Sequence, residues 1–137
     1  MKIRSAKVSD IKNLILFLKK NEMYNKHIDK ESIIRKKILH DKESIIVASS
    51  EENIIACIFI VFDPWRSHLH HFVVDKKIRN RGVGTKLLKN AEDLIKKRKC
   101  ELATLCVNKN EEQVIGFYRK RKWNFVPYES SNMEKVF

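Results

Sequence analysis

One segment of the sequence limits the possible folds and functions more than any other. Residues 73–85 run from an apolar stretch through a basic turn into a helical pattern. The turn contains Arg79 and Arg81 and ends at Gly82 and Gly84, two of only three glycines in the chain. Because glycine has no Cβ, a bulky anion can approach the backbone closely at these positions. A helix that begins here presents unpaired N–H groups and the positive end of its dipole. The segment therefore predicts a loop that binds phosphate groups.

The spacing of these glycines excludes two common nucleotide-binding motifs. A Walker loop requires Gly-Lys-Ser/Thr, which does not follow here, and the dinucleotide fingerprint requires a third glycine at a fixed spacing. The remaining alternative is a strand–helix turn that binds no ligand. Arg79, three residues ahead of Gly82, favours the ligand.

The apolar patterns around this loop predict one mixed α/β domain that covers residues 1–137. Apolar runs predict strands at residues 2–6, 44–50, 54–62, 67–75, 101–107, 123–128 and 133–137. Helical periodicity predicts a helix that follows Asp29 and others at residues 9–20, 82–99 and 111–121. Ser9 and Asp29 are the expected N-caps of the first two helices. Asn110 and Gln113 have the spacing of a capping box for the last helix.

The formal net charge of +12 is unusual, but it does not identify a partner by itself. It fits a lysine-rich solvated surface, and it also fits the attraction of a phosphate-bearing cofactor or a polyanion. The basic residues are scattered among acidic ones and lack the interleaved aromatic residues of a nucleic-acid platform. This pattern disfavours nucleic acid as a partner.

The remaining bulk properties predict a cytoplasmic protein without a membrane partner. The longest apolar run, residues 54–62, is far too short to cross a bilayer as a helix. No apolar stretch follows Lys2, Arg4 and Lys7, so the N-terminus does not have the pattern of a secretory signal. The three cysteines have no metal-ligand spacing and suit a reducing compartment.

The motif Arg79-x-x-Gly82-x-Gly84 resembles the Gln/Arg-x-x-Gly-x-Gly/Ala motif of the GNAT superfamily of acyl-CoA-dependent N-acetyltransferases. Further features resemble this family in the same chain order: Val74 ahead of Arg79, Leu87-Leu88, Leu105-x-Val107-x-x-Asn110, Phe117-Tyr118 and Met133-Glu134-Lys135. One departure is Lys122-Trp123, where the family usually has Gly-Phe. The resemblance covers essentially the whole chain. It implies a single α/β domain with a mixed, mostly antiparallel central sheet flanked by helices.

The resemblance also implies where acetyl-CoA, the co-substrate, would bind. In the family, a strand that separates from its neighbour pairs with the pantetheine arm through its backbone, which here corresponds to Phe72, Val73 and Val74. The asparagine that follows the next strand approaches the pantetheine, which corresponds to Asn110. Backbone amides of the loop hold the pyrophosphate, and the corresponding residues are Arg79, Asn80, Arg81, Gly82, Val83, Gly84 and Thr85.

Acetyl transfer from a thioester to an amine requires a neutral amine, a donor to the oxyanion and a proton for the departing thiolate. The family commonly places a tyrosine close to the cofactor sulfur, which implies that Tyr118 contacts the cofactor and supplies this proton. A half-buried tyrosine that only packs beside Phe117 is the alternative. The backbone N–H of Val74 is the expected donor to the thioester carbonyl.

Three histidines lie on the strand that leads to the loop. Strand alternation predicts His68 and His70 on one face and His71 on the other. His68 matches a position where several family members carry a catalytic glutamate, and an imidazole can accept a proton near neutral pH. We therefore expect His68 to be the base; the alternative is a partly exposed histidine without a catalytic role. No further ligand accompanies the His-x-His pair, so we expect no metal site.

The sequence and the resemblance together predict an N-acetyltransferase that transfers an acetyl group from acetyl-CoA to a primary amine. Direct transfer in a ternary complex is expected, because no cysteine has an evident activating neighbour. The acceptor is a small-molecule amine or an amine of a protein or peptide, and the protein is expected as a monomer or a homodimer. Two alternatives stay open: a non-catalytic acyl-CoA-binding regulatory module, and a basic nucleic-acid-binding domain. Candidate residues of the acceptor pocket are Tyr24, His27, Trp65 and Arg66.

Overall fold

A computed structural model of the chain describes residues 1–127 and 129–137. The described residues form two compact units, Met1–Leu105 and Cys106–Phe137. Within the described residues, no helix combines the length and the apolar character needed to cross a membrane.

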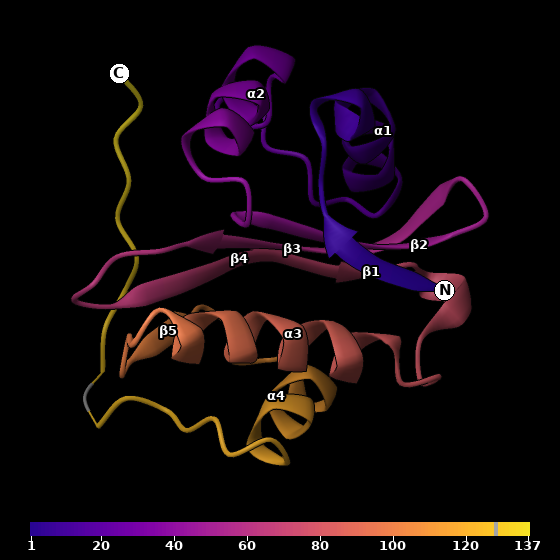
Figure 1. Cartoon of the computed structure of the whole chain (residues 1–137). Coiled ribbons are helices and arrows are strands. Elements are labelled where there is room, and N and C mark those ends of the chain that lie inside the picture. The colour runs from indigo at the N-terminus through magenta and orange to yellow at the C-terminus, as the bar shows by residue number, and fades with distance from the viewer. Residues whose placement is uncertain (128) are drawn as a thin grey trace. The chain divides into compact units, whose positions relative to one another are not determined.

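The first unit is built on a five-stranded sheet in the order β1-β2-β3-β4-β5 (Figure 1). The strands are β1 (Lys2–Ser5), β2 (Ile45–Ser50), β3 (Asn53–Val61), β4 (Ser67–Val74) and β5 (Ala103–Leu105). Neighbours from β1 to β4 pair antiparallel, whereas β4 and β5 pair parallel. A mixed, mostly antiparallel sheet confirms the fold class that the family resemblance implied.

Helices cover both faces of this sheet (Figure 1). The helices α1 (Ile11–Lys20) and α2 (Glu31–His40) lie on one face, and α3 (Val83–Lys97) lies on the other. Leu14, Leu18 and Ile34 are almost completely buried in the core under α1 and α2. On α3 the fully buried side chains include Leu87 and Leu88, as the helical periodicity predicted. Apolar burial of this extent is the main contribution to the stability of the unit.

The helix caps differ from those that the sequence predicted. The N-cap of α1 is Asp10 rather than Ser9, and the N-cap of α2 is Lys30 rather than Asp29. Asp29 accepts hydrogen bonds at 2.7 Å from the backbone N–H of Asn25 and from His71 Nε2. A carboxylate that finds a charge-assisted partner in the tertiary structure gains more than it would at a helix end, so the local preference is overridden.

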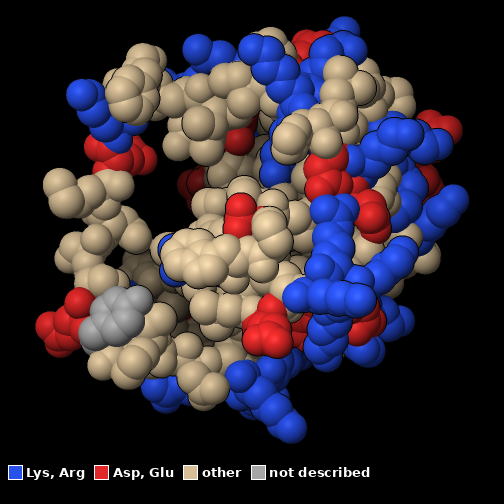
Figure 2. All heavy atoms as spheres, turned by 60° about the vertical axis from the view of Figure 1, so that its left-hand side comes forward, with Lys and Arg blue, Asp and Glu red and all other residues tan. Residues whose placement is uncertain are grey.

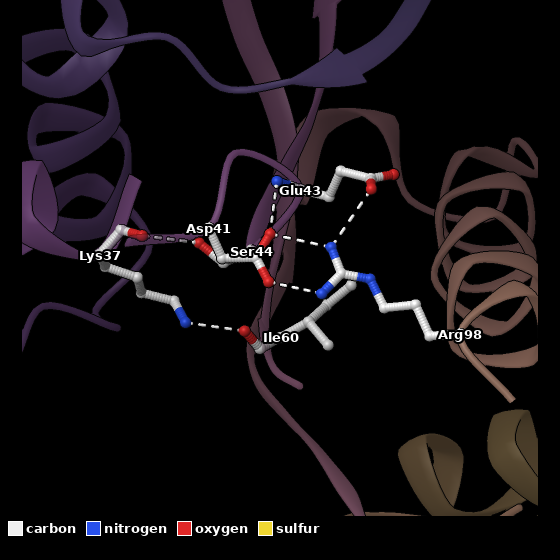
Figure 3. A network of polar contacts seen from close by, with 6 residues as sticks. All are labelled: Lys37, Asp41, Glu43, Ser44, Ile60 and Arg98. Atoms are coloured by element: carbon white, nitrogen blue, oxygen red, sulfur yellow. Dashed lines mark hydrogen bonds and ion pairs between the residues drawn. The ribbon is translucent and has the colours of Figure 1, made fainter. Parts of the chain in front are cut away.

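Arg98 connects the α3 side of the sheet to the loop between α2 and β2 (Figure 3). It is the C-cap of α3, and its guanidinium donates two hydrogen bonds to Asp41 at 2.5 and 2.9 Å and one to Glu43 at 3.2 Å. The guanidinium carbon also lies 3.6 Å from the ring centre of Phe62. The bidentate hydrogen bonds from Arg98 hold the pKa of the Asp41 carboxyl below its usual range.

The second unit contains the helix α4 (Glu112–Arg119). Its N-cap is Glu111, and no side chain caps it, so the predicted capping box of Asn110 and Gln113 is wrong. The backbone N–H of Asn110 instead donates to Asn108 Oδ1 at 3.0 Å, in a local turn that competes with the helix cap.

The strands predicted at residues 123–128 and 133–137 are also wrong: the described residues there form no strand, and Tyr128 lies outside the described part of the chain. Phe125 and Phe137 are largely exposed. Alternation of apolar and polar residues favours a strand only where a partner strand satisfies its backbone groups, and the alternation cannot specify that partner.

Candidate active site

The segment between β4 and α3 forms a loop in which two residues have a positive φ. After β4, the short 3₁₀ helix η2 (Lys76–Ile78) begins at Asp75, whose carboxylate accepts from Lys77 N–H at 2.9 Å and from Lys20 Nζ at 2.6 Å. Asn80 then has a φ of 64° and Gly82 a φ of 81°. Asparagine tolerates this left-handed region and glycine adopts it without strain, which explains these residue types.

Gly82 is the N-cap of α3, and no side chain caps this helix. The first intrahelical bond runs from Lys86 N–H to Gly82 O at 3.1 Å, so the N–H groups of Val83 and Gly84 precede the intrahelical pattern. A Cβ built at Gly82 would meet no atom within 4 Å. Backbone donors at a helix start, with open space at the glycine and two exposed arginines nearby, fit a phosphate-bearing ligand.

Among the described residues, the pairing of β4 with β5 covers only the first part of β4. The pairing of β4 with β5 ends at Leu69 and Leu105, whereas β4 stays paired with β3 as far as Val74. Asp75 N–H donates to Ile55 O of β3 at 2.9 Å, so strand alternation turns the backbone groups of Val74 to the other edge. There the Val74 carbonyl accepts a hydrogen bond from Arg79 Nε at 3.2 Å.

A β-bulge interrupts β4 just after its last pair with β5. His71 and Phe72 of β4 lie opposite one β3 residue, Ile58, because the register shifts between Cys57 and Phe59. His71 has a φ of 46°, and its ring centre lies 4.9 Å from that of Phe59, which belongs to the core under α1 and α2.

The bulge corrects the predicted placement of the histidines. His70 pairs with Phe59 in register and shares its face, so the rings of His70 and His71 are on the same face of the sheet. Strict alternation had predicted opposite faces. One extra residue in a strand resets the alternation, and nothing in the sequence marks that residue as extra.

His68, the expected base, lies at the second-last pair of β4 with β5. Its Nδ1 is 2.6 Å from Thr104 Oγ1, and its ring centre is 4.3 Å from that of His70. Burial, with a smaller contribution from the positive charge of Arg66, lowers the pKa of His68. Although His70 is exposed, partial desolvation by its neighbours, together with His68, His71 and Lys37, lowers the pKa of His70 to about 4. Both imidazoles are therefore neutral at pH 7.

The predicted site residues belong to both compact units. Phe72–Val74, the loop residues 79–85 and His68 belong to the first unit, and Asn110 and Tyr118 belong to the second. Asn110 is exposed, whereas burial raises the pKa of Tyr118 to about 12. Its ring contacts Phe117 and Trp123, at centre distances of 5.3 and 6.1 Å. A phenol with this pKa stays protonated throughout the physiological range.

The pair formed by Asp29 and His71 could not be predicted from the sequence. The two residues are 42 positions apart, and Asp29 had been assigned to a helix cap. A His and an Asp at this separation carry no spacing signal, because only the fold brings them together.

Comparison with known proteins places these features in a family. The family model described as the acetyltransferase (GNAT) family matches residues 12–123. Acetyltransferase YE1169 of Yersinia enterocolitica is 28% identical over 120 residues, which cover 88% of this chain and 85% of that protein. Acetyltransferase ECA0875 of Pectobacterium atrosepticum is 25% identical over 126 residues, which cover 92% of this chain and 89% of that protein.

Solved structures show the same fold. The PaiA N-acetyltransferase from Thermoplasma acidophilum, solved in complex with coenzyme A, superposes with a TM-score of 0.78 at 17% sequence identity. The superposition covers 88% of this chain and 87% of that one. At this level of identity the likeness concerns the fold alone.

Proposed function

Because this chain belongs to the GNAT family of acetyltransferases and is thus an acyltransferase, we propose that it transfers the acetyl group of acetyl-CoA to a primary amine. The observation that carries this proposal is the loop between β4 and α3, which combines an uncapped helix start with a glycine of positive φ and open space around it. The loop follows the part of β4 that lies beyond its last pair with β5, where the backbone N–H of Val74 points away from β3, and both features suit an extended phosphate-bearing cofactor.

In this proposal the loop residues 79–85 hold the pyrophosphate, chiefly through backbone N–H groups. Arg79, Asn80, Arg81 and Thr85 are exposed, whereas the Val83 side chain is buried and contributes only its backbone. The edge of β4 at Phe72–Val74 pairs with the pantetheine arm, and Asn110 also approaches that arm. Coenzyme A supplies the activated thioester, and the chain's own residues bind and orient it and move the protons.

Three groups of this chain would serve the chemistry. His68, neutral at pH 7, accepts the proton that the attacking amine loses. The backbone N–H of Val74, which points away from β3, donates to the oxygen of the thioester carbonyl as negative charge develops there. Tyr118 donates a proton to the departing thiolate, and its raised pKa keeps that proton available.

Direct transfer between the two substrates is favoured over a cysteine acyl-enzyme. Cys57 is fully buried and Cys100 is buried, so neither can reach a substrate. Burial raises the pKa of the Cys57 thiol, which removes the thiolate that a nucleophile requires. Cys106 is exposed, and its Sγ lies 3.8 Å from Asn132 Oδ1, an uncharged group that does not activate a thiol.

The acceptor is a small-molecule amine or an amine of a protein or peptide, and residues 1–137 act as one catalytic domain in the cytoplasm, as a monomer or a homodimer. No metal ion takes part in the proposed chemistry. Lys and Arg side chains are interspersed with Asp and Glu on the face that Figure 2 shows, which gives no reason to prefer nucleic acid as the partner. A non-catalytic acyl-CoA-binding module is the competing function.

The decisive experiment measures release of free coenzyme A from acetyl-CoA in the presence of a panel of small amines and peptides. Acceptor-dependent release that follows the appearance of the acetylated amine supports the enzyme. A thermal melt accompanies it, because acetyl-CoA at about 100-fold above its dissociation constant should stabilise the fold by about 2.7 kcal/mol. Stabilisation without turnover on any amine indicates the binding module, and a melt unchanged by millimolar acetyl-CoA contradicts both.

A further inference from the structure

The pair of Asp29 and His71 connects the loop between α1 and α2 to the bulge in β4. Asp29 is 2% exposed, and its Oδ2 lies 2.7 Å from His71 Nε2. The same oxygen accepts from the N–H of Asn25 at 2.7 Å, so the carboxylate is held from its own loop as well. A buried carboxylate is costly unless it is paired and hydrogen-bonded, so this placement must be compensated by its partners.

The residue that Asp29 contacts is the one with the unusual backbone in β4. His71 has a φ of 46°, a region that a non-glycine residue adopts only where its surroundings hold it there. Two further contacts do so: the His71 carbonyl accepts from Cys57 Sγ at 3.4 Å, and the imidazole packs on the ring of Phe59. Asp29 supplies the charged contact among the three.

The bulge lies between the last pair of β4 with β5 and the strand segment that follows it. Leu69 forms the last pair, His71 and Phe72 form the bulge, and Val73 and Val74 resume the register with β3. A bulge rotates the strand beyond it, so the conformation of His71 sets the direction in which the backbone groups of Phe72 and Val74 point.

We propose that Asp29 is a positioning residue that acts through His71 to hold the β4 bulge and thereby the backbone edge at Phe72–Val74 that binds the pantetheine arm. The proposal rests on the acyl-CoA binding put forward above. Asp29 belongs to the loop between α1 and α2, which also carries the candidate acceptor-pocket residues Tyr24 and His27. In this proposal that loop therefore helps to position the backbone of β4 that binds the cofactor.

The test compares two carboxylate-to-amide variants of the full chain, one at the buried Asp29 and one at the partly buried Asp10. Asp29→Asn removes the negative charge opposite His71 and keeps the side-chain shape. The control is Asp10→Asn, because Asp10 also accepts from a basic side chain, Arg4 at 2.7 and 2.9 Å, and from one backbone N–H, that of Lys7 at 2.7 Å. Asp10 lies at the start of α1, and these hydrogen bonds go to Arg4 and Lys7 rather than to β4 or its loop.

The first readout needs no ligand. Backbone amide NMR signals and hydrogen-exchange rates of Phe72, Val73 and Val74 should change in Asp29→Asn and stay at their wild-type values in Asp10→Asn. The second readout is the dissociation constant of coenzyme A by calorimetry, well below the melting temperature of each variant. Asp29→Asn should weaken binding about tenfold, and Asp10→Asn should leave it unchanged even if its melting temperature falls.

His71→Gly gives a second route to the same comparison. Glycine cannot contact Asp29, and its backbone is free to leave the positive φ, so this variant should weaken coenzyme A binding as Asp29→Asn does. The double variant Asp29→Asn with His71→Gly should bind no more weakly than His71→Gly alone, because the pair acts as a unit.

The outcomes separate this inference from the proposed function. If the wild-type protein does not bind coenzyme A, the proposed function fails, while the amide signals still report whether Asp29 holds the bulge. If the wild type binds and Asp29→Asn binds equally well with unchanged amide signals, the positioning role is refuted and the proposed function stands. Equal weakening by Asp29→Asn and Asp10→Asn would reduce the effect to general destabilisation and would overturn the inference.

Discussion

His68 and Thr104 join β4 to β5 through their side chains, with His68 Nδ1 2.6 Å from Thr104 Oγ1. The two residues are also partners in the strand register, one step before the last pair of these strands. The contact orients the imidazole close to the last pair of β4 with β5. It involves Nδ1, so Nε2 is the ring nitrogen that would face the acceptor amine. A base for the acceptor amine would be held here by a neutral hydroxyl rather than by a carboxylate.

The first prediction concerns His68 as that base. The pKa of its imidazole is lowered by burial, so the neutral form is present at pH 7 and is lost as the pH falls through the folded-state pKa. His68→Gln should lower kcat by about tenfold or more and remove the acidic limb that this titration causes in the pH–rate profile. Coenzyme A affinity should stay near the wild-type value.

Thr104→Val is the matched comparison for His68. It keeps the size of the side chain but removes the hydroxyl that orients the ring, so the acidic limb should remain while kcat falls by a smaller factor. If His68→Gln shows the pH–rate profile of the wild type, His68 is not the base and has only a structural role.

The second prediction concerns Gly84, which tests the phosphate loop more cleanly than Gly82. Gly82 has a φ of 81°, so any L side chain there is strained whatever ligand binds. Gly84 lies inside the first turn of α3, and Gly84→Val should abolish coenzyme A binding while the domain stays folded. Calorimetry checks the affinity. Lys96→Val places the same side chain at an exposed position near the other end of α3 and should bind normally.

The order of strands and helices and the loop before α3 could be predicted because their signals are local. Periodicity marked α3 and its buried face, and the glycines marked its start. The bulge at His71 could not be predicted, since it depends on how β4 registers against Cys57 and Phe59 of β3. The role of Asp29 depends on a contact across 42 residues and overrode a sound local preference for a helix cap.

The errors at the C-terminal end have the same physical origin. The apolar pattern of residues 123–128 meets only one of the two requirements of a strand, the alternation of its side chains. Its backbone groups need a partner edge, which no local pattern supplies. Residues such as Tyr118 were predicted through resemblance, because composition and spacing do not distinguish a catalytic tyrosine from one that only packs beside Phe117.

The third prediction concerns the pH dependence of stability through Asp41. The hydrogen bonds from Arg98 lower the folded-state pKa of Asp41 below its ordinary value of 3.8. The stabilisation is therefore complete above that ordinary value and is lost as the pH falls through the folded-state pKa. Asp41→Asn should lower the free energy of unfolding by about 1 kcal/mol at pH 7, and the difference from the wild type should shrink as the pH falls below about 4.

Urea unfolding at pH 7 and at a pH well below 3.8 measures this difference. Asp93→Asn is the control, because Asp93 pairs with Lys89 at 3.1 Å on the exposed surface of α3 and should contribute only about 0.3 kcal/mol. Equal losses in the two variants would show that the Arg98 contact is no stronger than an ordinary surface pair.

The last prediction concerns Tyr118, the proposed proton donor to the thiolate. Burial raises the pKa of its phenol to about 12, so the hydroxyl keeps its proton at every pH at which the enzyme would be assayed. Tyr118→Phe retains the ring and its contacts with Phe117 and Trp123 but removes that proton. A positioned acid usually contributes about 10²–10⁴-fold, and because a coenzyme A thiol is a fairly good leaving group, kcat should fall by about tenfold to a hundredfold. The shape of the pH–rate profile should not change, since Tyr118 does not titrate in that range, and coenzyme A affinity should stay near wild type. Single-turnover kinetics with saturating acetyl-CoA isolates the chemical step. A wild-type rate constant in that measurement would remove Tyr118 from the mechanism, whereas a slower step with intact affinity is the signature of an acid that acts only during transfer.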